Sequence, residues 1–146
     1  MQSNMADSEA GVVGKPNLLS PYVWLSLLTL LLVLLQAILA GQGWFEDRDY
    51  FDIHEMVANI IFLVVVVQLV LTALLKIQGP IGRTLLIMNG VLLVLVIVQI
   101  GLGYAYTEGE TDQAGAWHIP LGMVIFGLSG AIQGMARRLQ AEAGRH

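Results

Sequence analysis

Two histidines occupy matching places in two apolar stretches of this chain. His54 follows Gln36 by 18 residues, and His118 follows Gln99 by 19 residues. Ionisable side chains are rare in apolar helices, where they tend to face the interior of a bundle and mark function. Neutral imidazole is a common metal ligand. The repeated spacing therefore predicts one metal centre that takes one histidine from each half of the chain.

The composition restricts the class of protein that can carry such a centre. Of 146 residues, 7 are basic and 11 are acidic, and 56% are hydrophobic. Soluble domains contain about 25% charged residues, so this composition excludes a soluble enzyme. The chain has no cysteine, which excludes disulfides, thiolate metal sites and covalently attached c-type haem.

Four stretches without Asp, Glu, Lys or Arg predict four membrane-spanning helices. They lie between Lys15 and Glu46, between Glu55 and Lys76, between Arg83 and Glu108, and between Asp112 and Arg137. Each supplies the roughly 20 apolar residues that cross a bilayer core. The predicted helices are 21–42, 54–76, 84–106 and 117–138. Pro21 suits a helix start, and breaks are expected at Gly41, Gly43, Gly79-Pro80 and 108–115.

The two halves of the chain resemble each other, which predicts an internal duplication. Residues 21–76 and 84–138 would be two hairpin repeats inserted in the same direction, related by a pseudo-twofold axis along the membrane normal. The fold class predicted is all-α, a four-transmembrane-helix bundle with His54 and His118 at equal depth near its outer end. Residues 1–20 and 139–146 would be cytoplasmic tails, the first disordered. A cleaved signal peptide is the alternative for the N-terminal segment.

The distribution of charge predicts the orientation in the membrane. Basic residues concentrate in the two tails and the middle loop. The first and third loops are acidic, and Arg48 is their only basic residue. The positive-inside rule then predicts that both termini lie in the cytoplasm. The membrane that the chain spans would be the inner, cytoplasmic membrane of the cell. Trp44 and Trp117 lie with other aromatic residues at the outer level, as an interfacial belt does.

Each histidine begins a stripe of residues at helical spacing, and both stripes suit a flat cofactor. The stripes are His54, Ala58, Ile61, Val65, Gln68 and Thr72, and then His118, Gly122, Ile125, Ser129 and Gln133. The small residues Ala58 and Gly122 would leave a slot beside each imidazole. Two facing histidines could ligate both sides of a haem iron, since the macrocycle supplies the other four nitrogens. Haem b is therefore the expected cofactor, with its propionates received by Arg48, Trp44 and Trp117.

Alternative interpretations of these residues remain open. A single histidine at a helix end is usually an interfacial residue with one edge in water. Zinc fits less well, because it takes four ligands and Glu55, adjacent to His54, points elsewhere on a helix. Gln36 and Gln99 would either orient the histidines through their free N–H or form an interhelical hydrogen bond.

Several motifs resemble known families. The pattern Gln36-x3-Ala40-Gly41-x-Gly43-x-Phe45, with Asp52-x-His54 and His118-x-Pro120-x-Gly122, resembles an uncharacterised family of small four-span bacterial membrane proteins over residues 22–138. The architecture is also similar to one half of the haem A synthases and to four-helix b-type cytochromes. That likeness implies that His54 and His118 ligate haem.

The chain departs from the haem A synthase pattern in three respects. It has one such unit instead of two, Phe51 stands where the family has a glutamate, and Glu55 stands where it has an arginine. The resemblance thus supports a bundle that holds haem more than it supports an enzyme.

The leading hypothesis for function is a b-type haem membrane protein that passes single electrons near the outer face. Its partner would be a quinol or an external redox protein, besides the membrane lipids. The alternatives are a cofactor-free accessory subunit of a larger membrane complex or homodimer, and a haem-handling protein. Nucleic-acid binding is not expected, because the basic residues are few and scattered.

Overall fold

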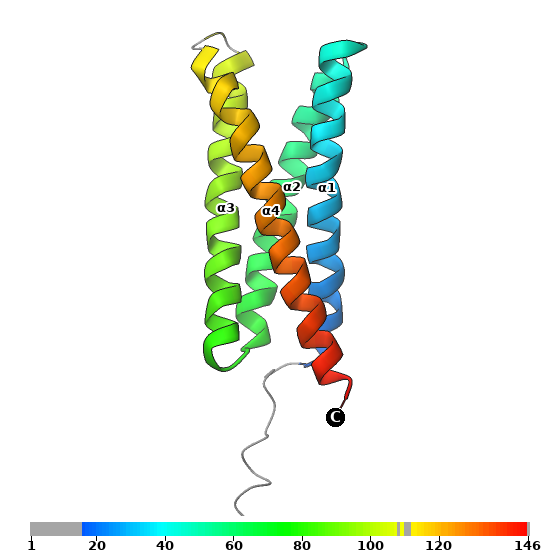
Figure 1. Ribbon diagram of the computed structural model, residues 1–146, viewed down its shortest axis with the longest axis vertical. Helices are drawn as coiled ribbons and strands as arrows, with labels where there is room; N and C mark the ends of the chain where they lie inside the picture. Colours follow the sequence, from blue (N-terminus) through cyan, green and yellow to red (C-terminus); the bar gives the residue numbers. More distant parts are fainter. Residues whose placement is uncertain (1–15, 108, 110–111, 146) are drawn as a thin grey trace, which may run out of the picture.

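The computed structural model describes residues 16–107, 109 and 112–145, and these residues form an all-α bundle (Figure 1). A 3-10 turn, η2 (Pro16–Leu18), leads into four helices. These are α1 (Leu19–Phe45), α2 (Tyr50–Leu75), α3 (Gly79–Thr107) and α4 (Asp112–Ala143). All four are long and apolar enough to cross a membrane, so the prediction of a multi-pass membrane bundle is confirmed. Of the tail predicted for residues 1–20, residues 1–15 lie outside the described residues, as do residues 108, 110, 111 and 146 of the predicted loop and C-terminal tail.

All four helices are longer than the sequence predicts. Pro21 and Pro80 lie in the first turns of α1 and α3, because a proline there lacks only an N–H that has no helical partner anyway. The expected breaks at Gly41 and Gly43 lie inside α1, since glycine is well tolerated in membrane helices. The chain regions 16–20, 112–116 and 139–143 are likewise helical instead of tail or loop.

The turn between α2 and α3 is fixed by backbone conformation. Lys76 takes up the left-handed region with φ of 49°, which ends α2, and Gly79 has φ of 73°. Gly82 is buried in the first turn of α3, where an added Cβ would overlap the carbonyl oxygen of Ile77. Only glycine lets the backbone of the turn approach the helix this closely.

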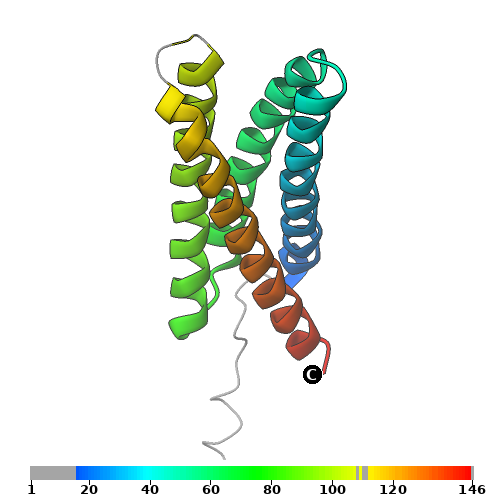
Figure 2. The same ribbon diagram turned by 45° about the horizontal axis from the view of Figure 1, so that its top comes forward.

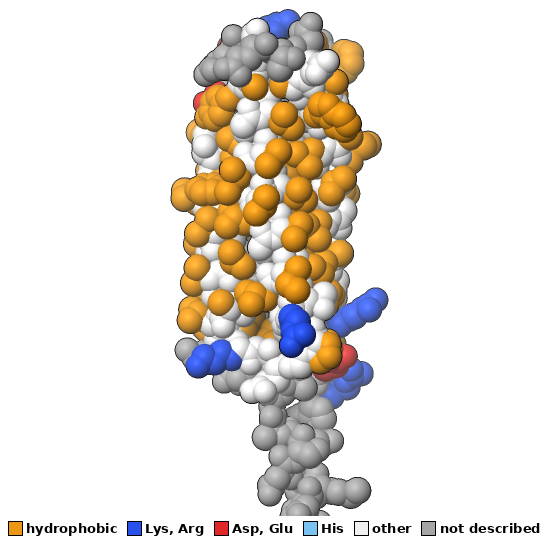
Figure 3. Space-filling model, turned by 90° about the vertical axis from the view of Figure 1, so that its left-hand side faces the viewer, with side chains coloured by type: hydrophobic (Ala, Val, Ile, Leu, Met, Phe, Trp, Pro, Cys, Tyr) orange, Lys and Arg blue, Asp and Glu red, His pale blue; other side chains and the backbone are white. Residues whose placement is uncertain are grey.

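The four helices form a closed ring in which each has two neighbours. α1 packs against α2 and α4, and α3 packs against the same two helices. The described chain begins and ends at one end of the bundle (Figure 1). Basic side chains gather at that end below a wide apolar band (Figure 3). We call it the basic end, and the opposite end, which carries the acidic α1–α2 loop, the acidic end. Towards the acidic end the α1–α2 pair and the α3–α4 pair diverge (Figure 2).

A buried polar cluster lies in the half of the core nearer the basic end. The Gln68 amide donates to Asn89 Oδ1 at 2.6 Å and accepts from the Thr29 hydroxyl at 2.6 Å. Asn89 in turn donates to the Tyr22 hydroxyl at 3.0 Å, so this chain of bonds joins α1, α2 and α3. Ser26 of α1 bonds to Gln133 of α4. The predicted inward faces of α2 and α4 are confirmed: Ile61, Val65, Gln68, Thr72, Ile125, Ser129 and Gln133 are all buried.

The Gly82 contact gives a first prediction. Gly82→Ala should lower the free energy of unfolding by about 2 kcal/mol or more, because its Cβ meets backbone that cannot rotate away. Gly90→Ala is the matched control on the same helix, since nothing lies within 4 Å of its Cβ position. Unfolding of both variants in mixed SDS and dodecyl maltoside micelles, followed by circular dichroism, makes the comparison. Equal stability of the two variants would contradict the described turn.

The polar cluster gives a second prediction. Asn89→Leu removes both the acceptor of the Gln68 Nε2 bond and the donor to the Tyr22 hydroxyl. Interhelical hydrogen bonds in membranes average about 0.6 kcal/mol, so a loss of about 1 kcal/mol is expected. Asn59→Leu is the control, because Asn59 is exposed and bonds only to its own helix. The same unfolding measurement in mixed micelles compares the two variants. If Asn89→Leu were as stable as Asn59→Leu, the hydrogen bonds of Asn89 would contribute nothing to the free energy of unfolding.

Candidate functional site

Two hydrogen bonds between α1 and α2 hold His54. Its ring Nδ1 lies 3.1 Å from the backbone oxygen of Gln36. In return the Gln36 side-chain Nε2 donates to the backbone oxygen of His54 at 2.9 Å. A carbonyl oxygen has two lone pairs, so each can accept this bond beside its helical one. The pair therefore fixes both the position of the helices and the direction of the ring.

The same two bonds recur between α3 and α4. His118 Nδ1 lies 3.0 Å from the backbone oxygen of Gln99, and Gln99 Nε2 donates to the backbone oxygen of His118 at 2.9 Å. The interhelical hydrogen bond expected of both glutamines is thus confirmed. The histidine N–H is bonded by the glutamine backbone, whereas the glutamine side chain bonds the histidine backbone.

These bonds determine the tautomer of both histidines. A carbonyl oxygen can only accept, so Nδ1 carries the hydrogen in each ring. In a neutral imidazole the other nitrogen, Nε2, then keeps its lone pair. Both rings are therefore prepared to accept a hydrogen bond or to ligate a metal ion through Nε2.

The two imidazoles are close neighbours from opposite helical hairpins. Their ring centres are 6.1 Å apart, and their planes are inclined by 50°. Both are half-buried and line one cavity of about 560 Å³, which we call the histidine cavity. Its size lies within the range of small-molecule and cofactor pockets, about 300–1,000 Å³. None of its lining residues is charged.

An aliphatic floor closes the histidine cavity towards the basic end. It consists of one buried residue from each helix, namely Val33, Ile61, Val96 and Ile125. Ala58 and Gly122 line the cavity as predicted. Gly122 also makes room for the glutamine beside it, because an added Cβ would lie 3.3 Å from Gln99 Nε2.

The cavity opens sideways between α1 and α4. Every exposed residue of its lining belongs to these two helices, whereas the lining from α2 and α3 is buried or half-buried. Met123 is 73% exposed and Ile119 is 67% exposed at this opening. The opening is therefore on the apolar outer surface of the bundle, and an apolar molecule within a bilayer could reach the histidines through it.

Aromatic and polar contacts cover the acidic end of the bundle. The Trp44 ring packs edge-on against Phe51, with ring centres 6.0 Å apart. It also lies tilted against Tyr106 of the other hairpin, with ring centres 6.5 Å apart. The Tyr104 hydroxyl donates to Glu55 at 2.9 Å, which joins α3 to α2. Contacts between the two hairpins therefore continue on the acidic side of the histidine pair.

The structure brings together six of the nine residues that the sequence singles out. His54, His118, Ala58, Gly122, Gln36 and Gln99 line the histidine cavity. Trp44, Arg48 and Trp117 do not line it: Arg48 lies over the Trp44 ring at 6.0 Å, and Trp117 is 68% exposed.

Sequence reasoning misses one close neighbour of the site. An added Cβ at Gly103 would lie 3.4 Å from the His118 ring. Gly103 follows Gln99 by four residues, as Ala40 follows Gln36, and that shared position was the signal that could have identified it. Within the described ranges, no group of three or more His, Cys, Asp or Glu residues could hold a bare metal ion.

Three comparisons with known proteins place these residues in context. Residues 36–105, just under half of the chain, match the model of a family of unknown function (DUF6220). No curated protein and no solved structure matches. None of these comparisons gives a link to haem A synthases or b-type cytochromes. The chain is thus similar to an uncharacterised family, and the matched part contains Gln36, His54 and Gln99 of the site.

Proposed function

We propose that this chain is an integral membrane protein that holds one b-type haem between His54 and His118 and passes single electrons. The observation that carries the proposal is the pair of imidazoles, each oriented by a backbone carbonyl, with ring centres 6.1 Å apart in an apolar cavity. A bound haem supplies a one-electron redox couple.

The separation of the two rings fits a single metal ion between them. An imidazole–metal bond is about 2 Å, and a ring nitrogen lies about 1 Å from its ring centre, so shared ligation needs ring centres about 6 Å apart. Two histidines alone are too few ligands for a bare zinc ion, and no third ligand from a His, Cys, Asp or Glu group joins them among the described residues. A macrocycle that brings four nitrogens of its own makes the two protein ligands sufficient.

The protein contributes orientation and a dry environment. The carbonyls of Gln36 and Gln99 hold the Nδ1 hydrogens and thereby direct Nε2 as the donor. If both histidines were to ligate a bound haem, no position would be left for oxygen, which would favour electron transfer over oxygen chemistry. The backbone oxygens of the two glutamines then orient the imidazoles, while their side chains form the interhelical hydrogen bonds that were the other role open to them.

Charge supports an orientation with both termini in the cytoplasm. Lys76, Arg83, Arg137 and Arg138 lie at the basic end, and the positive-inside rule places that end in the cytoplasm. The histidine cavity lies towards the acidic end and hence near the outer face of the inner membrane. The equivalent hydrogen bonds at His54 and His118 support two parallel hairpin repeats.

The sideways opening supports a partner that travels within the membrane. A quinol in the bilayer could approach between α1 and α4, where the exposed lining residues are apolar. An external redox protein would have to approach the aromatic cover at the acidic end. We therefore favour a quinol as the electron partner.

The same opening favours a second candidate function, haem handling. An apolar path from the bilayer to the cavity would let haem itself enter and leave. The rate of haem transfer to apomyoglobin distinguishes the two functions: an electron carrier should retain its haem for hours, and a haem-handling protein should release it within minutes.

The proposal predicts a defined spectrum for the purified protein. Expressed with ample haem and purified in detergent, the chain should show the reduced-minus-oxidised bands of a six-coordinate low-spin b-type haem. His54→Ala and His118→Ala should each abolish that low-spin spectrum, because each removes an axial ligand. His146→Ala, which changes the third histidine of the sequence, is the control. A colourless wild-type preparation would remove the proposal and leave the cofactor-free accessory subunit.

The opening predicts a selective effect on the rate of reduction. Ala37→Phe places a ring in the opening between α1 and α4 and should slow reduction by a membrane-dissolved quinol about tenfold by steric exclusion, roughly 1.4 kcal/mol in the activation free energy. Reduction by dithionite and the spectrum itself should not change. Ala73→Phe, at an exposed position of α2 outside the lining, is the control. Stopped-flow absorbance measures both rates, and equal slowing by both variants would exclude this route.

A further inference from the structure

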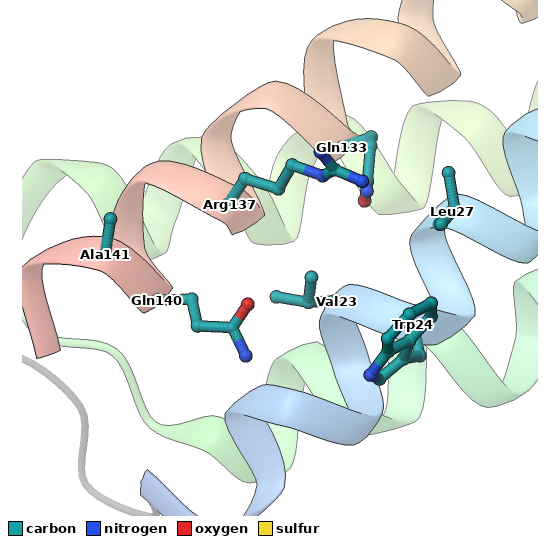
Figure 4. A pocket seen from close by; sticks show the side chains of 7 residues that line it. All are labelled: Val23, Trp24, Leu27, Gln133, Arg137, Gln140 and Ala141. Atoms are coloured by element: carbon teal, nitrogen blue, oxygen red, sulfur yellow. The ribbon is translucent and has the colours of Figure 1, made fainter. Parts of the chain in front are cut away.

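A second cavity, of about 400 Å³, lies between α1 and α4 near the basic end (Figure 4). We call it the α1–α4 groove. Val23, Trp24 and Leu27 of α1 form its apolar wall, and Gln133, Arg137 and Gln140 of α4 form its polar wall. It shares no lining residue with the histidine cavity, so an inference about it does not rest on the proposed function.

The polar wall is built as a single helix face. Gln133, Arg137 and Gln140 follow one another at spacings of four and three residues, which aligns them along one side of α4. In the part of the chain that the structure describes, Arg137 forms no ion pair and is the only charged residue of the lining. A guanidinium presents its donors in a planar fork that matches the oxygens of a phosphate group.

Gln133 supplies a second, independent indication of a ligand. Its side chain is only 5% exposed, and its Oε1 accepts a hydrogen bond from Ser26. Its Nε2 is buried and has no hydrogen-bond partner among the described residues. Buried donors are nearly always satisfied, so an unpartnered one beside a cavity indicates an acceptor that the protein itself does not supply.

The position of the groove indicates which molecule would bring these acceptors. Trp24, at its edge, is 67% exposed, and tryptophan is typical of the membrane interface. From Arg137 inward, the groove reaches Gln133 and the apolar side chains of α1 (Figure 4). A phosphate at Arg137 would thus lie at headgroup level, with apolar surface leading from it into the bilayer.

We propose that the α1–α4 groove binds one anionic phospholipid. Arg137 and Gln140 hold its phosphate, and Gln133 Nε2 donates to an ester carbonyl of its glycerol backbone. The acyl chains then lie along the apolar wall formed by Val23 and Leu27. Basic pockets between membrane helices bind anionic headgroups by the same combination of charge and hydrogen bonding.

The test is lipid binding by the full chain in dodecyl maltoside, titrated with phosphatidylglycerol or phosphatidylcholine and measured by native mass spectrometry. Wild-type protein should bind phosphatidylglycerol more tightly than phosphatidylcholine. Arg137→Gln should weaken phosphatidylglycerol binding about tenfold or more, because a hydrogen bond to a charged group is lost. Arg138→Gln is the matched control: it removes the same charge from the adjacent exposed position, which does not line the groove.

Two further variants keep the test decisive if Arg137→Gln fails to fold. Arg137→Lys keeps the positive charge but lacks the planar set of guanidinium donors. It should therefore weaken phosphatidylglycerol binding by less than Arg137→Gln does. Gln133→Leu should weaken the binding of both lipids and leave the preference between them, since both contain the ester carbonyl. Circular dichroism checks the fold of each variant.

Three results would overturn the proposal. Equal losses for Arg137→Gln and Arg138→Gln would show diffuse attraction to charge instead of a site. An unchanged affinity in Gln133→Leu would remove the ester contact. Displacement of phosphatidylglycerol by millimolar glycerol 3-phosphate or inorganic phosphate would identify a free phosphate compound, and not a lipid, as the occupant.

Discussion

The hydrogen bonds between each glutamine and histidine determine most of what this bundle can do at its acidic end. In a bilayer, water cannot satisfy polar groups, so the donors of a spanning helix gain most from partners within the protein. Here the glutamine Nε2 and histidine Nδ1 atoms bond to the backbone of the neighbouring helix, at 2.9 to 3.1 Å in all four bonds, whereas Gln36 Oε1 and Gln99 Oε1 are buried without a partner among the described residues. One set of contacts therefore joins α1 to α2 and α3 to α4, sets the tautomer of both imidazoles and fixes their direction.

The core has two halves of different chemistry, although all four helices pass through both. Near the basic end, amides and hydroxyls bond to one another across the helices. Beyond the aliphatic floor, the histidine cavity is apolar except for its glutamines and imidazoles. Close packing of helices explains the first half, where polar partners hold the bundle together. The two hairpins diverge towards the acidic end (Figure 2), and this divergence explains the second half, where the histidine cavity lies between them.

Much of this arrangement could be predicted from sequence because helical periodicity is strong in apolar segments. The stripe that begins at His54 identifies the inward face of α2, and the matched spacing from Gln99 to His118 identifies its counterpart. Helix ends could not be predicted as well, since Gly41 and Gly43 weaken helices in water but lie inside α1 here. Residue types also carry no information about main-chain oxygens, so the sequence cannot show that the ring nitrogens bond to the backbone of Gln36 and Gln99. Trp44 and Trp117 do not line the cavity, and sequence cannot separate the two roles, because an aromatic side chain at this level serves equally well as an interfacial anchor.

The aliphatic floor has an electrical consequence. Val33, Ile61, Val96 and Ile125 carry no group that can pass a proton, so along the described helices the hydrogen-bonded amides beneath them are insulated from the imidazoles above. Any proton path that ran the length of the bundle through its core would have to pass these four side chains, which can neither donate nor accept a hydrogen bond.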